Sequence, residues 1–186
     1  KSLQKLKDKG KFIYSYGDFF SQKGYYLASV SDSIFLNPMG NVELRGLGAE
    51  VLYYKQLQEK YGFKMEVVRH GKYKSAVEPY LDDKMSEANR NQIKSLLNSI
   101  WDGIGNQIKL SRKISSENFN KVVDNLDATF PENAYRNNIV DGIVSKTQYK
   151  YKLKRVLGIK SNEKLNSVSY LKIKNNSNFK KGTRNQ

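Results

Sequence analysis

The sequence predicts an α/β domain with a largely parallel sheet flanked by helices. Two observations predict this class: short runs of β-branched and aromatic residues, and amphipathic segments at helical spacing that alternate with them. Hydrophobic residues make up 38% of the 186 residues, which is low, but 13 Tyr and 8 Phe add apolar volume. The chain is therefore long enough and apolar enough to form a core.

In the first half of the chain, three apolar runs have strand character and two segments have helical character. The expected strands are Phe12–Tyr16, Ser33–Leu36 and Lys64–Arg69, and the expected helices are Tyr25–Val30 and Ala49–Tyr61. Polar residues at Asn37–Asn41 predict a turn after the second strand.

The second half is expected to be mainly helical. Ser86 is a good N-cap for the longest helix, which runs toward Leu110. The apolar stripe of this helix can belong to the core or in part face a neighbouring subunit, and its spacing does not distinguish the two. The stripe consists of Ile93, Leu96, Leu97, Ile100, Ile104 and Ile108. Further helices are expected at Ser116–Leu126, at Glu132–Asn138 after Pro131, and at Lys146–Leu157, with an edge strand or extended segment at Ser167–Lys174.

Composition excludes several classes of function. The chain has no cysteine, which rules out disulfides and thiolate chemistry, and it has no run of 18 apolar residues that would span a membrane. Its formal charge of +15 invites a nucleic-acid interpretation, but residues 146–186 carry +11 of this charge and the rest of the chain is nearly balanced. We therefore do not expect a nucleic-acid partner. The basic tail fits a solvated linker, a segment that faces anionic lipid, or a lysine-rich composition.

One lysine stands where a strand is expected to stop and a constrained loop to begin. Gly71 ends the third expected strand, and Pro79 biases Glu78 away from the α region, so the backbone around Lys74 is expected to be well defined. A lysine has a pKa near 10.4 and serves as a base at neutral pH only when burial lowers its pKa to about 7–8. The apolar residues that follow Lys74 can bury it, or can pack at a core edge while it stays solvated.

The segment around this lysine resembles a known family. Gly71–Tyr80 is very similar to the segment that carries the general-base lysine in long-form signal peptide peptidases, also called protease IV. The resemblance covers roughly residues 5–160. Its other matching segments, in family order, are Ser21–Ser29, Ile34–Gly46, Leu52–Lys55, Asp82–Ser86 and Ala134–Asp141.

The resemblance implies a Clp-protease or crotonase type of fold and a serine peptidase with a Ser/Lys dyad. In the long form of the family, two related repeats form one chain, and the first repeat supplies the lysine while the second supplies the nucleophilic serine. Lys74 matches the lysine position. The resemblance further implies hydrophobic signal-peptide substrates, a homo-oligomer, no cofactor, no metal, and attachment to the bacterial inner membrane with the enzymatic domain outside the cytoplasm.

The nucleophile position departs from the family pattern. The family places its serine in a Ser-Gly-Gly-Tyr type turn that opens a helix, whereas this chain has Gln22-Lys23-Gly24-Tyr25. Gln22 therefore stands at the nucleophile position, and Ser21 is expected to be a turn residue or helix N-cap rather than a nucleophile. This is how a first repeat is expected to look, so the catalytic serine is expected outside these 186 residues.

The domain boundaries are expected to follow the resemblance. Residues 1–160 are expected to form a single peptidase-repeat domain, and residues 161–186 a basic linker or edge strand toward a second repeat. The chain begins at Lys1 without an initiator methionine, and we expect a membrane anchor before it and the second repeat after Gln186.

Several other features have weaker interpretations. His70 is the only histidine, which removes histidine triads, and the pairs Ser2–Lys5 and Ser161–Lys164 match Ser-x-x-Lys only by chance. Glu78, Asp82 and Asp83 lack the spacing of a cation site and are expected in a solvated turn, and Gly46-Leu47-Gly48 is expected to allow close backbone packing. The alternative function is a non-catalytic peptide-binding or assembly module of the same fold; acyl-CoA chemistry of the crotonase type would need a pocket that the sequence does not indicate.

Overall fold

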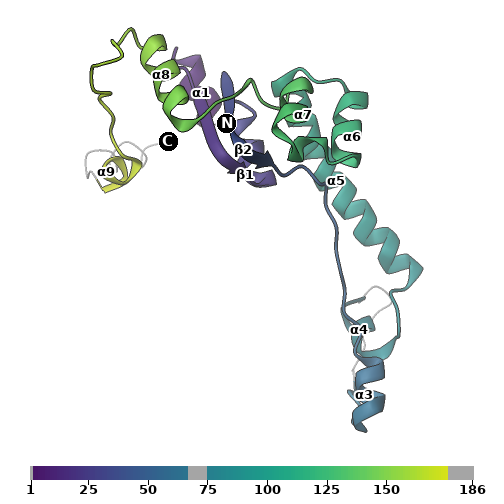
Figure 1. Ribbon diagram of the computed structural model, residues 1–186. Coiled ribbons are helices and arrows are strands. Elements are labelled where there is room, and N and C mark those ends of the chain that lie inside the picture. The colour runs from purple at the N-terminus through teal and green to yellow at the C-terminus, as the bar shows by residue number, and fades with distance from the viewer. Residues whose placement is uncertain (1, 67–74, 176–186) are drawn as a thin grey trace. The chain divides into compact units, whose positions relative to one another are not determined.

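The computed structural model describes residues 2–66 and 75–175 (Figure 1). The chain forms two compact units, Lys1–Ile143 and Val144–Gln186. The first unit contains the sheet and most of the helices. The domain boundary expected near residue 160 stays a prediction.

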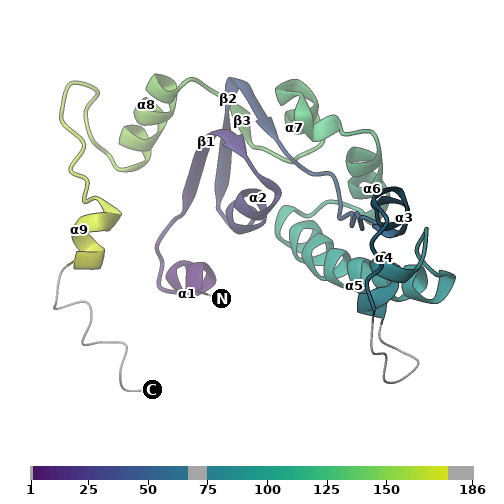
Figure 2. The same cartoon turned by 90° about the horizontal axis from the view of Figure 1, so that it is seen from below.

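The first unit is built on a parallel sheet, as the sequence predicts. Its strands β1 (Tyr14–Phe20), β2 (Ser33–Val42) and β3 (Gly142–Ile143) lie in the order β1-β2-β3, and both pairings are parallel. Helix α2 (Gln22–Ala28) connects β1 to β2 and lies beside both strands and helix α5 (Figure 2). The predicted α/β class with helices flanking a parallel sheet is confirmed.

The pairing of β1 and β2 contains a large bulge. Gly17 pairs with Leu36 and Phe19 with Asn41, so a single residue of β1 faces four residues of β2. The predicted turn at Asn37–Asn41 is therefore wrong, because these residues belong to β2 and the bulge absorbs the extra length. Gly40 is required there, since an added Cβ would collide with the carbonyl oxygen of Asp18.

The core lies between the sheet and the helices α2, α5 (Glu87–Arg112), α6 (Ser116–Asp124) and α7 (Pro131–Arg136). Trp101 of α5 stacks on Phe119 of α6 with a centroid distance of 5.9 Å. Gly105 lets the two helices approach, because a Cβ would lie 3.1 Å from the Phe119 ring. The largest fully buried side chains are Tyr25, Phe119, Ile34, Leu36, Leu44, Ile108, Ile139, Val42, Val122 and Val140.

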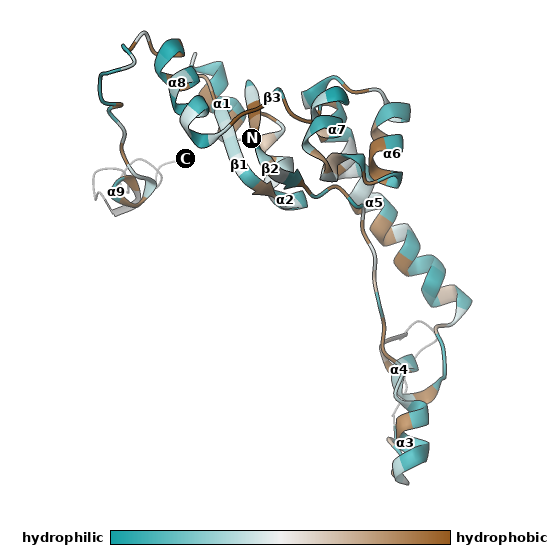
Figure 3. Cartoon of the chain, viewed as in Figure 1, coloured by the Kyte–Doolittle hydropathy of each residue, from teal (hydrophilic) through white to brown (hydrophobic). Residues whose placement is uncertain are grey.

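The long helix α5 divides into a core half and an exposed half. Its predicted N-cap is confirmed, since the Ser86 hydroxyl accepts a hydrogen bond from Asn89 N. Ile108 is fully buried, whereas Leu96 is 60% and Ile100 45% exposed. Hydrophobic bands extend along the helix (Figure 3), yet only the C-terminal part of the stripe packs into the core.

The segment between β2 and α5 differs from the prediction in three ways. Helix α3 (Lys55–Tyr61) is shorter than the expected Ala49–Tyr61. No strand forms at 64–66, where Met65 N donates to a side chain, and the rest of the expected strand lies outside the described residues. Pro79 opens helix α4 (Glu78–Leu81) after the 3₁₀ turn η1 (Ser75–Val77), so its expected effect on Glu78 is wrong because proline is favourable in a first helical turn.

The remaining elements are short. Helix α1 (Ser2–Asp8) precedes β1, and the 3₁₀ turn η2 (Asp127–Thr129) lies between α6 and α7. In the second unit, α8 (Lys146–Val156) matches its prediction and begins with a capping box at Ser145 and Gln148. Helix α9 (Tyr170–Asn175) occupies the place of the expected edge strand, which is wrong for these residues. A helix satisfies its own backbone groups, whereas an edge strand needs a partner.

Among the described residues, no helix combines the length and the apolar character that a membrane span requires.

A buried arginine joins the helices to the sheet. The Arg112 side chain at the end of α5 is only 7% exposed. Its Nη1 and Nη2 atoms donate hydrogen bonds to the Asp141 carboxylate at 3.0 and 2.8 Å. Its Nε and Nη2 atoms donate to the Asn138 carbonyl at 3.2 and 3.1 Å. Asp141 also accepts from Ile34 N of β2 at 2.7 Å. Nearby, the buried Tyr25 hydroxyl donates to the Ile139 carbonyl at 2.7 Å, and burial raises the pKa of Tyr25 above its ordinary value.

This network yields a stability prediction. Replacing Arg112 by Leu leaves the Asp141 carboxylate and the Asn138 carbonyl without their fork-shaped partner, and we expect the free energy of unfolding to fall by about 2–4 kcal/mol. Urea denaturation followed by circular dichroism measures this change. The Arg112→Lys variant keeps the positive charge but not the forked set of donors, so its free energy of unfolding should fall by less than that of the Leu variant. A Leu variant as stable as the parent chain would contradict the stabilising role of Arg112.

Candidate functional site

The lysine that the sequence singles out, Lys74, lies outside the described residues, and so does His70. The structure describes the chain again from Ser75. The described part of the site consists of the residues that follow Lys74 and of the segment that matches the nucleophile turn.

The buried carboxylate of Glu78 connects the residues after Lys74 to the beginning of α5 by hydrogen bonds. Glu78 is only 6% exposed and accepts hydrogen bonds from Ser86 N at 3.2 Å, Ser86 Oγ at 2.7 Å and Asn89 Nδ2 at 2.9 Å. Asn89 is itself buried. A carboxylate is also favoured at this place because the first turn of a helix carries partial positive charge. Glu78 thus fixes the chain four residues after Lys74.

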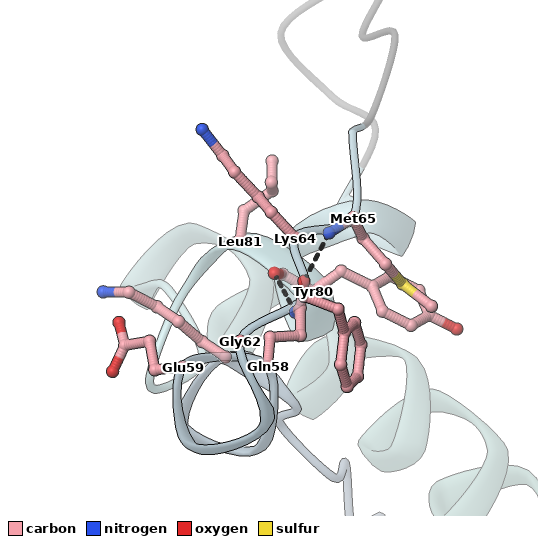
Figure 4. Close-up of a pocket in the computed structure, with 9 residues that line it drawn as sticks. Gln58, Glu59, Gly62, Lys64, Met65, Tyr80 and Leu81 are labelled. Atoms are coloured by element: carbon pink, nitrogen blue, oxygen red, sulfur yellow. Dashed lines mark hydrogen bonds between the residues drawn. The ribbon is translucent and has the colours of Figure 1, made fainter.

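The other side of this segment packs on the residues around α3. Tyr54 N donates to the Pro79 carbonyl at 2.7 Å, and the rings of Tyr54 and Tyr80 stack with centroids 5.6 Å apart. The buried Gln58 side chain donates to the Tyr80 carbonyl and accepts from Met65 N, both at 2.7 Å (Figure 4). Gln58 therefore bridges the chain just before residues 67–74 and the chain just after them.

A pocket lies beside this bridge. It has a volume of about 340 Å³ and an open mouth, and its wall includes Phe63, Met65, Tyr80 and Leu81 (Figure 4). These four side chains are each at least 36% exposed. The wall is mainly apolar, which suits aliphatic or aromatic side chains more than a charged ligand.

The Tyr53 hydroxyl is buried and has no hydrogen-bond partner among the described residues. Burial raises the pKa of the Tyr53 phenol, and the negative charges of Glu78 and Asp82 raise it further. A buried hydroxyl without a partner costs about 1–3 kcal/mol, so it marks a place where the structure has an unmet hydrogen bond.

At the position that matches the family nucleophile, the structure places an amide that holds the backbone. Gln22 Nε2 donates to the Gly46 carbonyl at 3.0 Å, and Arg45 N donates to Gln22 Oε1 at 3.1 Å. Both ends of the Gln22 amide are therefore occupied by the loop after β2. Gly46 has a φ of +79°, and the space around Gly46 and Gly48 is open, so the predicted close packing there is wrong and backbone conformation explains Gly46.

Ser21 is a helix cap, as predicted. Its hydroxyl accepts a hydrogen bond from Gly24 N at 3.2 Å and begins α2. A serine in this role orients its oxygen toward the backbone of the helix.

The acidic residues near Lys74 do not gather around one point. Asp83 pairs with Lys55 at 2.8 Å, whereas Glu78 is buried against α5. The predicted solvated turn is confirmed for the exposed Asp82 and Asp83 and is wrong for Glu78. Within residues 2–66 and 75–175, no group of three or more His, Cys, Asp or Glu side chains could hold a metal ion.

Sequence reasoning missed the roles of Glu78, Gln58 and Tyr53. A signal for Glu78 was present, because an acidic residue eight positions before an N-cap serine can reach the orphan N–H groups of that helix when a turn lies between them. Gln58 carried no comparable signal, since an exposed and a buried glutamine look alike in a helical pattern.

The Gln22 contacts lead to a test. The Gln22→Ala variant removes both hydrogen bonds to the loop after β2, and we expect the free energy of unfolding to fall by about 1–2 kcal/mol. Hydrogen exchange at Arg45 N should accelerate in the same variant. Gln107→Ala, on the exposed side of α5, is the matched control and should leave both quantities unchanged; equal behaviour of the two variants refutes the role of Gln22.

The Glu78 contacts lead to a second test. Glu78→Ala leaves the Ser86 and Asn89 donors unsatisfied, and we expect the chain between β2 and α5 to lose local stability by about 2–4 kcal/mol. Limited proteolysis should then cut this chain faster than in the parent protein.

Tyr53→Phe is the matched control for Glu78→Ala, because it removes a hydroxyl at the same place that has no described partner. We expect this variant to resist proteolysis at least as well as the parent. Faster cutting of Tyr53→Phe, or unchanged cutting of Glu78→Ala, would contradict the contacts described above.

Comparisons with known proteins agree with this architecture. Residues 5–160 match Peptidase family S49. The chain is 32% identical over 178 residues to Protease 4 of Salmonella typhi and 31% identical over 176 residues to Protease 4 of Haemophilus influenzae, in each case over 91% of this chain and 29% of the relative. It is also 28% identical over 171 residues to the chloroplastic serine protease SPPA of Arabidopsis thaliana, over 90% of this chain and 24% of the relative.

The chain thus spans less than a third of the length of these relatives. The parallel sheet with flanking helices is the arrangement expected of the Clp-protease-like fold of the matched family. The match covers most of the chain, and the chain belongs to peptidase family S49.

Proposed function

We propose that this chain is the lysine-bearing part of a serine endopeptidase that uses a Ser/Lys dyad. Lys74 acts as the general base, and the nucleophilic serine comes from a second repeat of the same protein. The 186 residues alone are then inactive. Membership of peptidase family S49 and the serine protease named among the relatives support a serine peptidase.

The main support for the proposal comes from the contacts of Ser21 and Gln22, in the turn that matches the nucleophile turn of the family. Gln22 occupies the position that matches the family nucleophile. Its side-chain amide donates a hydrogen bond to the Gly46 carbonyl and accepts one from Arg45 N. The neighbouring Ser21 oxygen caps α2. A working nucleophile needs a hydroxyl within reach of a base, and this turn provides an amide and a capping serine instead. This arrangement supports a nucleophile that comes from a second repeat.

The proposed chemistry needs one proton carrier. The neutral Lys74 amine takes the proton of the serine hydroxyl as its oxygen attacks the peptide carbonyl, and the resulting ammonium gives that proton to the leaving amine. Water then cleaves the acyl-enzyme with the same lysine as base. The buried Glu78 contacts support the role of Lys74, because they anchor the chain four residues after it.

The proposed substrates are hydrophobic signal peptides that remain in the membrane after secretion. The proposed enzyme is a homo-oligomer attached to the bacterial inner membrane, with its enzymatic part outside the cytoplasm. These statements rest on the resemblance to signal peptide peptidases.

A second function fits the same observation. With an amide at the nucleophile position, the chain can serve as a non-catalytic module that binds peptides or assembles with other subunits. In that case Lys74 makes only a structural contact. The two functions differ in whether Lys74 is needed for reaction with a serine-directed inhibitor.

Activity-based labelling separates these functions. The complete protein should react with a fluorophosphonate probe and hydrolyse a peptide substrate, whereas the 186-residue chain should do neither. In the complete protein, Lys74→Ala should lower kcat/KM by roughly 100- to 10,000-fold, the usual contribution of a general base. Lys72→Ala, in the same segment, is the control and should retain activity.

Each contrary outcome has a clear meaning. Labelling of the short chain would make a local serine the nucleophile and overturn the division of the dyad. Full activity of the Lys74→Ala protein would remove Lys74 from catalysis. If the complete protein neither reacts with the probe nor cleaves peptides, the non-catalytic module is the correct function.

A further inference from the structure

The second unit carries most of the net charge of the chain. Residues 146–186 contain 12 Lys and Arg but only one acid, Glu163, so they account for +11 of the total of +15. Helix α8 alone has five cations and no acid. Lys146, Lys150, Arg155 and Lys160 are exposed, and none of them pairs with a carboxylate in the described part of the chain.

The same unit exposes apolar side chains. In residues 144–175 the only hydrophobic side chain that is buried is Val144. In α8 and its C-cap, Tyr149, Leu153, Val156 and the capping residue Leu157 follow helical spacing, and the last two are 49% and 45% exposed. Up to residue 175, the other large hydrophobic side chains exposed in this unit are Tyr151, Val168, Tyr170, Leu171 and Ile173.

Cations border the apolar stripe of α8 on both sides. At 100° per residue, Lys150 and Lys152 fall on opposite flanks of the stripe that contains Leu153 and Val156. Long cationic side chains in these positions can extend to a charged surface while the apolar face lies against it. This pattern is typical of helices that lie in the plane of a membrane surface.

We propose that the described part of the second unit, residues 144–175, binds the surface of a membrane that contains anionic lipid. Its cations bind lipid headgroups, and Val156, Leu157 and the exposed residues of α9 enter the boundary between headgroups and acyl chains. This interaction is independent of the peptidase activity proposed above, because no residue of the dyad takes part in it.

The apolar residues decide between a lipid surface and a nucleic acid. A nucleic acid complements the cations, and tyrosines can stack on bases, but Val156, Leu157, Leu171 and Ile173 gain nothing from phosphates or base faces. An anionic lipid surface complements both kinds of side chain, since it offers negative charge above an apolar layer. Charge complementarity together with exposed aliphatic groups therefore favours lipid.

Vesicle sedimentation with the 186-residue chain tests this proposal. We expect the chain to sediment with vesicles of phosphatidylcholine and phosphatidylglycerol and to stay in solution with phosphatidylcholine alone. Raising NaCl from about 0.1 M to about 1 M should weaken the binding, because the Debye length falls from about 10 Å to about 3 Å.

Two variants separate the contributions of charge and apolar contact. The triple variant Lys150→Gln, Arg155→Gln, Lys160→Gln should bind roughly 100-fold more weakly, from about fivefold per charge near an anionic surface. The double variant Val156→Ser, Leu171→Ser has the same net charge as the parent chain and should bind vesicles at least about fivefold more weakly.

Matched controls lie in the first unit. The variant Lys5→Gln, Lys9→Gln, Lys60→Gln removes the same number of exposed cations, and Leu110→Ser removes a side chain that is 73% exposed. Both controls should bind vesicles within about twofold of the parent chain, and circular dichroism should show that all variants keep their helices.

The proposal is overturned if phosphatidylglycerol vesicles do not bind the chain, or if the first-unit controls lose as much binding as the second-unit variants. It is also overturned if the serine variant binds vesicles as well as the parent while the chain binds a random DNA duplex more tightly than vesicles. In that case the surface is a nucleic-acid site. A loss confined to the second-unit variants supports the proposal.

Discussion

The fold depends on one constraint, which is the placement of a short strand that follows β2 by about a hundred residues. Strand β3 has only two residues, Gly142 and Ile143, so its own pairing with β2 cannot hold it in position. Asp141 supplies the missing fixation: its backbone N–H donates to the Ile34 carbonyl, and its carboxylate accepts from Ile34 N. Arg112 then ties this carboxylate to the end of α5. A single aspartate thereby sets the register of β3, and a single arginine joins the sheet to the helices.

This arrangement explains why the chain between β2 and α5 has a different character. Its fixed points are polar: the Gln22 amide holds Arg45 and Gly46, and Glu78 holds the beginning of α5. Apolar side chains such as Tyr61 and Phe63 remain 68% and 48% exposed there. A segment held by a few directed hydrogen bonds rather than by a core keeps its ends in place with little apolar burial. In the proposed peptidase, that property suits a segment whose reactive partner belongs to another repeat.

The parts of the fold that periodicity and capping predict are the parts that depend on local chemistry. Ser21 and Ser86 are N-caps, as their positions predict, because a hydroxyl at the start of a helix can accept a hydrogen bond from the first N–H groups of that helix. The helices that begin near residues 116 and 146 also lie close to their predicted bounds. The errors fall where distant residues decide. Asn37–Asn41 became strand because β1 lies beside it, and residues 170–175 became helix where no neighbouring strand is available among the described residues. The site shows the same division: Gln22 was located by its position in a motif, but its two backbone partners lie over 20 residues away.

In the proposed peptidase, a glutamine at the position that matches the family nucleophile has a structural role as well as lacking a hydroxyl. A serine in a turn that opens a helix has an oxygen that can be activated, but it is too short to reach a loop on the neighbouring strand. A glutamine at the same position is longer by one methylene group and an amide carbon and carries both a donor and an acceptor, so it can donate to one backbone carbonyl and accept from one backbone N–H of the same loop. In this chain the peptide groups of Arg45 and Gly46 fill that role, directly after the strand that leads out of the sheet. In the proposed peptidase, a repeat that does not react uses this position to stabilise its own backbone, in keeping with the proposed division of roles between two repeats.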